Sequence, residues 1–80
     1  MLKLENGAEV ILFVGDKHEG YVLARDKTAY VVWYCYVFDD CNTLRCADGM
    51  YYPQNSLAKA KKNFRKRAAR FLALLENIDQ

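Results

Sequence analysis

The sequence contains few of the residues from which catalytic sites are usually built. Its 80 residues include one histidine, one proline and three cysteines. A catalytic nucleophile needs a base that a third group holds in place, and nothing in the spacing pairs the only histidine, His18, with a cysteine. No glycine-rich stretch ends in Lys-Ser or Lys-Thr, which excludes the phosphate loop of nucleotide-binding proteins. We therefore expect a protein that is not an enzyme and that uses no cofactor.

The three cysteines, Cys35, Cys41 and Cys46, are odd in number and unevenly spaced. This pattern fits reduced thiols in a cytoplasmic protein better than a disulfide framework. Structural zinc is usually held by ligand pairs about two to four residues apart, and the four residues between Cys41 and Cys46 lie at the edge of that range. His18 would have to act as a ligand from a distant loop. We favour buried thiols that behave as small apolar side chains over a metal site.

Long hydrophobic runs are also missing from the chain. The first residues show no basic segment followed by a long apolar one, so we expect no secretory signal. The longest apolar segment, residues 29–38, is shorter than the roughly 20 residues that a membrane span requires, and it reads as a strand. We expect a cytoplasmic protein without a membrane partner.

The charges are unevenly distributed along the chain. Residues 1–58 carry five basic and eight acidic side chains, a net charge of −3, whereas residues 59–80 carry seven basic and two acidic ones, a net charge of +5. All seven of these basic residues fall within residues 59–70, which include no acidic residue. A helix that only needs to be solvated usually interleaves Glu with Lys at four-residue spacing. The pattern therefore indicates a charged surface on one element.

The part of the chain before this basic stretch reads as short strands separated by turns. Segments rich in β-branched and aromatic residues predict strands at residues 8–14, 21–25, 29–38, 43–46 and 50–52, with turns between them. Pro53 ends the last strand, because proline cannot donate a hydrogen bond to a sheet ladder.

The long strand at residues 29–38 has two unlike faces. Alternation places Val31, Trp33, Cys35 and Val37 on one side, and Tyr30, Val32, Tyr34, Tyr36 and Phe38 on the other. Both faces are apolar enough to need cover. We expect one face to fill the interior of a curled sheet and the aromatic face to serve as the dock for a helix, rather than as a stacking platform for bases.

The remaining residues predict one amphipathic helix at residues 57–77, with Asn55 or Ser56 as its N-cap. Its apolar side consists of Leu57, Ala60, Phe64, Ala68, Phe71, Leu75 and Ile78. Its other side carries Lys59, Lys62, Arg65, Lys66 and Arg70, with Lys61 and Arg67 at the flanks. We expect one α+β domain over residues 1–80, with a five-stranded antiparallel small barrel at 7–55 and the basic helix at 56–78 packed on it.

Five short strands, a proline-ended last strand and a terminal helix resemble the SH3-like small barrels. Within this group, the segment NGAEVILFVGDKHEGYV is similar to a KOW motif, with Gly7, Val10, Gly15, Gly20 and Val22 at its glycine and valine positions. In KOW proteins the loop between the first two strands often contacts RNA or a protein partner. The resemblance therefore implies a second contact at Lys17 and His18.

The segment YYPQNSL is similar to the last strand and following turn of Tudor- and SH3-like domains. In those domains a tyrosine-proline pair commonly lines a peptide groove. Because we expect a helix to cover the aromatic face of the long strand, we expect Tyr51 and Tyr52, near Pro53, to be the exposed aromatic residues and a secondary contact.

The basic helix leads to a functional hypothesis, a non-enzymatic module that binds RNA, DNA or a nucleoprotein complex. Its phosphate contacts would come from Lys59, Lys62, Arg65, Lys66 and Arg70, with help from Lys61 and Arg67. Two alternatives stay open. The chain could be an intracellular inhibitor or adaptor of the phage or mobile-element type, including anti-CRISPR-like proteins, that covers an acidic patch on a protein. It could also form a homodimer through the long strand or the helix.

Overall fold

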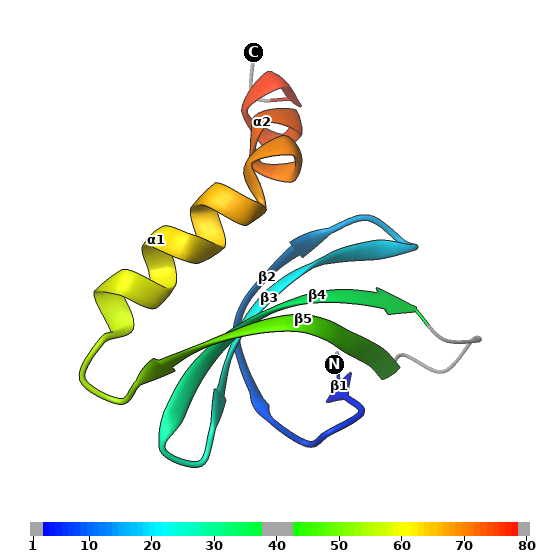
Figure 1. Cartoon of the computed structure of the whole chain (residues 1–80). Coiled ribbons are helices and arrows are strands. Elements are labelled where there is room, and N and C mark those ends of the chain that lie inside the picture. The colour runs from blue at the N-terminus through cyan, green and yellow to red at the C-terminus, as the bar shows by residue number, and fades with distance from the viewer. Residues whose placement is uncertain (1–2, 38–42, 79–80) are drawn as a thin grey trace.

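The computed structural model of the chain, which describes residues 3–37 and 43–78, is a curled sheet followed by two helices (Figure 1). The strands are β1 (Lys3–Leu4), β2 (Glu9–Gly15), β3 (Glu19–Asp26), β4 (Ala29–Val37) and β5 (Thr43–Pro53), and the helices are α1 (Leu57–Arg67) and α2 (Ala69–Ile78). The strand order in the sheet is β1-β5-β4-β3-β2. The predicted α+β class is confirmed, and the strongly curled half-barrel is compatible with a small SH3-like barrel.

The prediction of a wholly antiparallel sheet is wrong. β1 pairs with β5 in parallel, whereas the other neighbouring strands are antiparallel. The sequence does not predict β1, because two residues are too few to show an alternating pattern. Among the described residues the sheet forms a half-barrel, and its closure into a full barrel is not seen.

The segments predicted as two strands at residues 43–46 and 50–52 belong to the single strand β5. Ala47 pairs with Tyr34 and Met50 pairs with Val32, so the two residues between them, Asp48 and Gly49, lie opposite Trp33 alone. This β-bulge absorbs an extra residue without ending the strand. Asp48 takes a positive φ of 54° there. The predicted turn at residues 47–49 is therefore wrong, because its turn-forming residues build a bulge.

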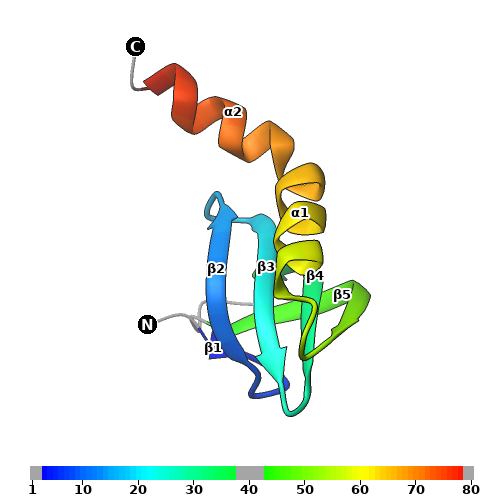
Figure 2. The same cartoon turned by 90° about the vertical axis from the view of Figure 1, so that its left-hand side faces the viewer.

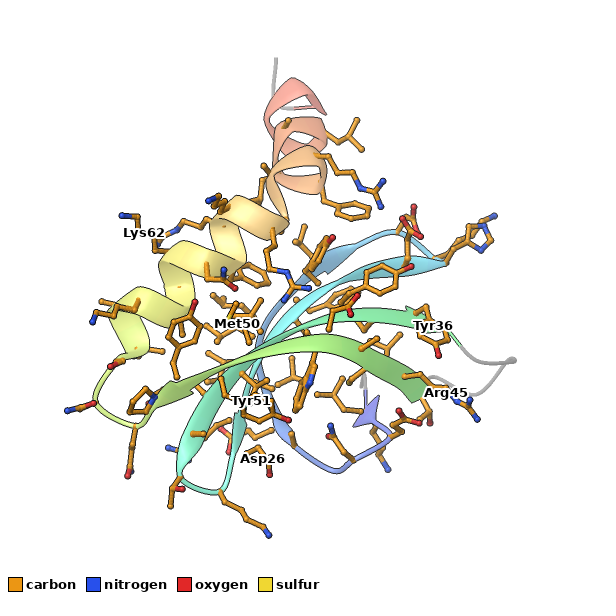
Figure 3. All side chains as sticks on the ribbon, in the orientation of Figure 1. Asp26, Tyr36, Arg45, Met50, Tyr51 and Lys62 are labelled. Carbon is orange, nitrogen blue, oxygen red and sulfur yellow. The ribbon has the colours of Figure 1, made fainter. Side chains whose placement is uncertain are left out.

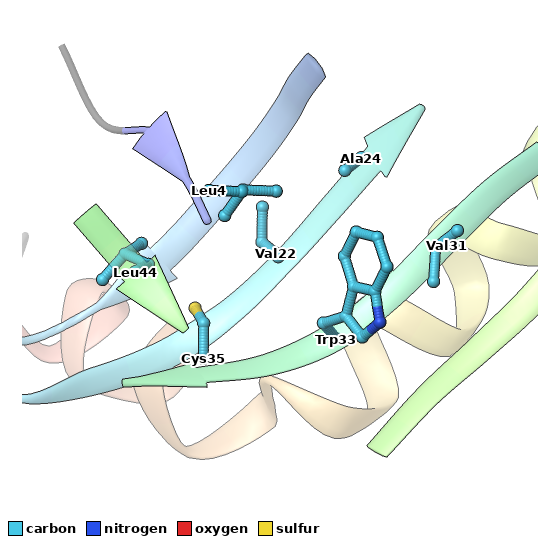
Figure 4. Close-up of a cluster of buried hydrophobic side chains, with 7 residues drawn as sticks. All are labelled: Leu4, Val22, Ala24, Val31, Trp33, Cys35 and Leu44. Carbon is cyan, nitrogen blue, oxygen red and sulfur yellow. The ribbon is translucent and has the colours of Figure 1, made fainter. Parts of the chain in front are cut away.

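The concave side of the sheet holds an apolar core (Figure 4). Its buried residues are Leu4, Val22, Ala24, Val31, Trp33, Cys35 and Leu44. This confirms the predicted interior face of β4 for its described side chains; that of Val37 lies outside them. Cys46 is half-buried beside Cys35, its partner in the β4–β5 pairing. Burial raises the pKa of Cys35 to about 12 and that of Cys46 to about 11, so both thiols stay neutral. Cys41 lies outside the described residues.

The opposite side of the sheet carries the helices. A second core there consists of Val14, Leu23, Val32, Ala60, Phe64, Ala68 and Phe71, with Tyr21, Tyr30, Tyr52, Leu57 and Leu72 partly buried against it. The aromatic face of β4 is thus confirmed as the helix dock at Tyr30 and Val32. Tyr34 instead packs against two other tyrosines, with ring centres 5.7 Å from Tyr21 and 6.0 Å from Tyr36. Phe38 lies outside the described residues.

The predicted single helix is wrong, because two helices meet at Ala68. α1 begins at Leu57, as predicted, and Ser56 occupies its N-cap position without a side-chain capping hydrogen bond. The carbonyl of Ala68 accepts hydrogen bonds from the N–H groups of both Phe71 and Leu72, at 3.0 and 3.1 Å, and the chain changes direction there. α1 packs across β3, β4 and β5, and α2 continues past the end of β2 (Figure 2). The side chains of Leu75 and Ile78, predicted on the apolar side, lie outside the described ones.

Candidate functional site

Four cations of α1 are exposed: Lys59, Lys62, Arg65 and Lys66. We call these four residues the α1 basic face. Among the side chains that the structure describes, none of the four forms an ion pair or a side-chain hydrogen bond. The first turn of α1 holds no acidic residue, so the helix itself supplies no carboxylate there. The α1 basic face is therefore a positive surface without an acidic partner among the described side chains.

Arg67, predicted as an assisting cation at the flank of the helix, turns toward the sheet. Its Nη1 atom donates hydrogen bonds to the carbonyl oxygens of Val32 and Asp48, at 2.9 and 2.8 Å. Its guanidinium also lies over the ring of Tyr21, 5.2 Å from the ring centre. Because Asp48 belongs to the β5 bulge and Val32 to β4, this one side chain ties the end of α1 to two strands.

Arg70, predicted as a phosphate contact, has an acidic partner in its own chain. Its guanidinium forms an ion pair with the carboxylate of Glu19 and lies over the ring of Phe71, 4.6 Å from the ring centre. The hydroxyl of Tyr34 donates a hydrogen bond of 2.9 Å to the other oxygen of Glu19. This hydrogen bond raises the pKa of Tyr34. Glu19 thus links the start of α2 to β3 and β4.

The turn between β2 and β3 holds Glu19 in place. The Oδ1 atom of Asp16 accepts hydrogen bonds from the backbone N–H groups of His18 and Glu19, at 2.8 and 2.9 Å. These backbone hydrogen bonds, the one from Glu19 first, lower the pKa of Asp16. Lys17 and His18, predicted as a second contact, are exposed in this turn, apart from the start of α1 (Figure 1).

A shallow hollow of about 300 Å³ lies between α1 and β5. It is lined by Tyr52, Lys59, Lys62, Asn63 and Lys66, and its walls are mostly carbon. The four helical residues recur at spacings of three and four, which places them on one side of α1. We call this feature the α1–β5 hollow. The structure therefore brings three of the predicted lysines together around one aromatic ring.

The two neighbouring tyrosines of β5 lie on opposite faces of the sheet. Tyr52, predicted to be exposed, is instead half-buried, because it packs against the helix-side core, and it lines the hollow. Tyr51 is 60% exposed on the other side, where its ring centre lies 6.1 Å from that of Trp33. Figure 3 labels Tyr51 and, on the same strand, Met50, which is 50% exposed. Met50 pairs with Val32 of the helix-side core, so it faces the same side as Tyr52.

Asn63 is the member of this site that sequence reasoning missed. Its Oδ1 atom is buried and has no hydrogen-bond partner among the described residues. A signal was present in the sequence: Asn63 is the one uncharged polar residue within the basic stretch 59–70, and it immediately precedes the core residue Phe64. The remaining predicted cation, Lys61, is half-buried and does not line the hollow.

The described residues contain no group of three or more His, Cys, Asp or Glu side chains that could hold a metal ion. In the same part of the chain, no helix is long and apolar enough to span a membrane.

Comparisons with known proteins found no match for this chain. No family model matches it, and no curated protein and no solved structure is significantly similar to it.

Proposed function

We propose that this protein is a non-enzymatic module that binds nucleic acid through the α1 basic face. The observation that carries the proposal is the contrast between these four cations and three arginines elsewhere in the chain. Arg25 pairs with Glu9 at 3.5 Å, Arg45 with Glu5 at 3.6 Å, and Arg70 with Glu19. Glu9, Glu5 and Glu19 are thus paired with arginines outside the α1 basic face. A positive surface without internal compensation favours an anionic partner.

Binding of this kind depends on phosphates and is mostly independent of base sequence. Each phosphate that a lysine or arginine neutralises releases counterions, so affinity falls as the salt concentration rises. Arg65 adds a planar guanidinium, which can hold two phosphate oxygens at once, whereas the three lysines act as point charges. Lys61 and the turn residues Lys17 and His18 are candidates for additional contacts.

The fold class is also compatible with this function, although it does not identify the ligand. Small curled β-modules with an exposed binding element occur among nucleic-acid and peptide readers, and a KOW- or Tudor-like member of the SH3-like barrels would fit this half-barrel. We propose that relationship as a finer assignment, together with a cytoplasmic location.

The test compares two double variants with the same change in charge. Lys62→Gln/Lys66→Gln alters the α1 basic face, and Lys3→Gln/Lys27→Gln alters two exposed lysines of the sheet region. We expect fluorescence anisotropy at low salt to show about a 10-fold or larger loss of affinity for a labelled oligonucleotide in the first variant only. The slope of log affinity against log salt should fall by about 0.7 per lost contact on a single strand.

Two results would overturn the proposal. One is an absence of binding to any oligonucleotide at low salt; an acidic protein captured through the same lysines would then favour the inhibitor or adaptor alternative. The other is an equal loss in both double variants, which would show that net charge alone matters. The homodimer alternative stays a prediction, and sedimentation of the same samples measures it.

A further inference from the structure

The α1–β5 hollow has features that phosphate binding does not require. Its walls are mostly carbon, and an aromatic ring, that of Tyr52, forms part of them. The buried polar atom without a partner, Oδ1 of Asn63, is a hydrogen-bond acceptor. The hollow therefore suits a planar group that is apolar on its faces and polar at its edge.

Asn63 gives this ligand its polar contact. A carboxamide offers an acceptor and two N–H donors side by side, and the side chain of Asn63 uses none of them on the described residues. A buried polar atom without a partner destabilises the folded state, so its presence needs an explanation. Asparagine pairs in this manner with base edges that carry a neighbouring donor and acceptor.

The size of the hollow and the surrounding side chains agree with a single base. About 300 Å³ lies at the lower end of the range for small-molecule sites, roughly 300–1,000 Å³. Aromatic side chains bind unpaired bases by stacking, largely irrespective of which base it is. Met50, exposed on the same side of β5 as Tyr52, adds apolar surface.

The lysines around the hollow are spaced to hold the backbone of the same strand. Lys59 and Lys66 are seven residues apart, which is about 10 Å along a helix. Cations at this separation, with Lys62 between them, can neutralise phosphates on both sides of one nucleotide.

We propose that the α1–β5 hollow receives one unpaired nucleobase of a single strand, with Asn63 hydrogen-bonded to its edge and its flanking phosphates on Lys59 and Lys66. This proposal rests on the proposed function and specifies its ligand. In a duplex the bases are paired and stacked, so they cannot enter the hollow. The protein then prefers single strands over duplexes, a preference that the α1 basic face alone does not predict.

The experiment uses three labelled probes of one length: a single strand, its duplex, and a strand whose bases are replaced by abasic sites. We expect the protein to bind the single strand about 5- to 150-fold more tightly than the abasic strand, the range that stacking of a base supplies. Asn63→Leu and Tyr52→Leu should reduce this ratio toward one. Tyr51→Leu, the neighbouring tyrosine on the opposite face, should leave the ratio unchanged.

The outcomes separate the two proposals. Equal affinity for the single strand and the abasic strand overturns the base site, while the proposed function stands. The base site is also overturned if both Asn63→Leu and Tyr52→Leu still bind the single strand more tightly than the abasic strand. A lack of binding to all three probes overturns the proposed function and the base site with it. Tyr52 is half-buried, so Tyr52→Leu could fail to fold. Asn63→Leu places a better helix former in α1, and a thermal melt of this variant checks that the fold is intact.

Discussion

The basic stretch of the C-terminal segment divides into two regions with different roles. Lys59, Lys62 and Lys66 surround the α1–β5 hollow, whereas Arg67 and Arg70 contact their own sheet. The residue types match these roles. A planar guanidinium can bridge two carbonyl oxygens, or hold a carboxylate while lying over a ring, and an ammonium group cannot do so with the same geometry. One run of like charges can thus divide between contacts inside the fold and an exposed surface, and counting its cations overestimates the exposed positive surface.

The largest expected effect is on the free energy of unfolding, and it tests whether Arg67 contributes to the fold while the exposed lysines do not. Arg67→Ala removes two hydrogen bonds from a charged donor and leaves the carbonyl groups of Val32 and Asp48 without it. We expect the free energy of unfolding to fall by about 2–3 kcal/mol, measured by urea denaturation. Lys66→Ala, one position earlier and exposed, should change it by less than about 0.5 kcal/mol. Equal effects of the two substitutions would show that Arg67 is not an anchor.

A smaller effect of opposite sign is expected beside the hollow. Asn63→Leu removes the buried acceptor without a partner and adds a better helix former, so we expect a gain of about 1 kcal/mol in the free energy of unfolding. Lys62→Leu, the exposed neighbour, serves as the control and should change stability by less than about 0.5 kcal/mol. A protein that becomes more stable but loses its preference for bases would show that Asn63 is retained for binding. A loss of stability in Asn63→Leu would contradict the absence of a partner.

The smallest effect concerns the anchor at α2. Glu19→Gln removes the ion pair with Arg70, which is largely exposed, so we expect the free energy of unfolding to fall by only about 0.5 kcal/mol.

The same carboxylate also affects the titration of Tyr34. The hydrogen bond to Glu19 raises the pKa of Tyr34 above its ordinary value of 10.0. The stabilisation from the neutral phenol is therefore complete below pH 10 and is lost as the pH rises through the raised pKa. In Glu19→Gln, ultraviolet titration should show Tyr34 ionising closer to pH 10; an unchanged titration would mean that the carboxylate does not control it.

Much of the fold could be predicted from local patterns. The alternation in β4 separates its two faces, and the apolar spacing places Ala60, Phe64 and Phe71 on the sheet. The break at Ala68 could not be predicted, because alanine is the best helix former and no proline or glycine marks the position. The contacts that accompany the break, such as that of Arg67 with Val32, join residues 35 positions apart in the sequence. A pattern within one helix does not report such contacts.

The sequence predicted the positive charge of the candidate site, but it did not predict the hollow or the side chains that line it. Lys59, Lys62 and Lys66 are identifiable because their helix lacks interleaved acidic residues. The roles of Arg67 and Arg70 depend on carbonyl and carboxylate groups that only the folded sheet brings near them. Asn63 carries no distinguishing pattern beyond being uncharged among cations. Its place beside Tyr52 follows from the packing of α1 against β5, which joins residues distant in the sequence.

The bulge in β5 also affects how any relatives of this chain should be aligned with it. Leu44 and Tyr52 are eight positions apart, an even number that would put both on one face of a regular strand, yet they belong to opposite cores. The extra residue at Asp48 and Gly49 reverses the alternation between them. An alignment gap belongs at that point when a related strand is regular. A gap placed one element away would match the wrong tyrosine to the helix side and would misassign the aromatic position of the hollow across the whole set of homologues.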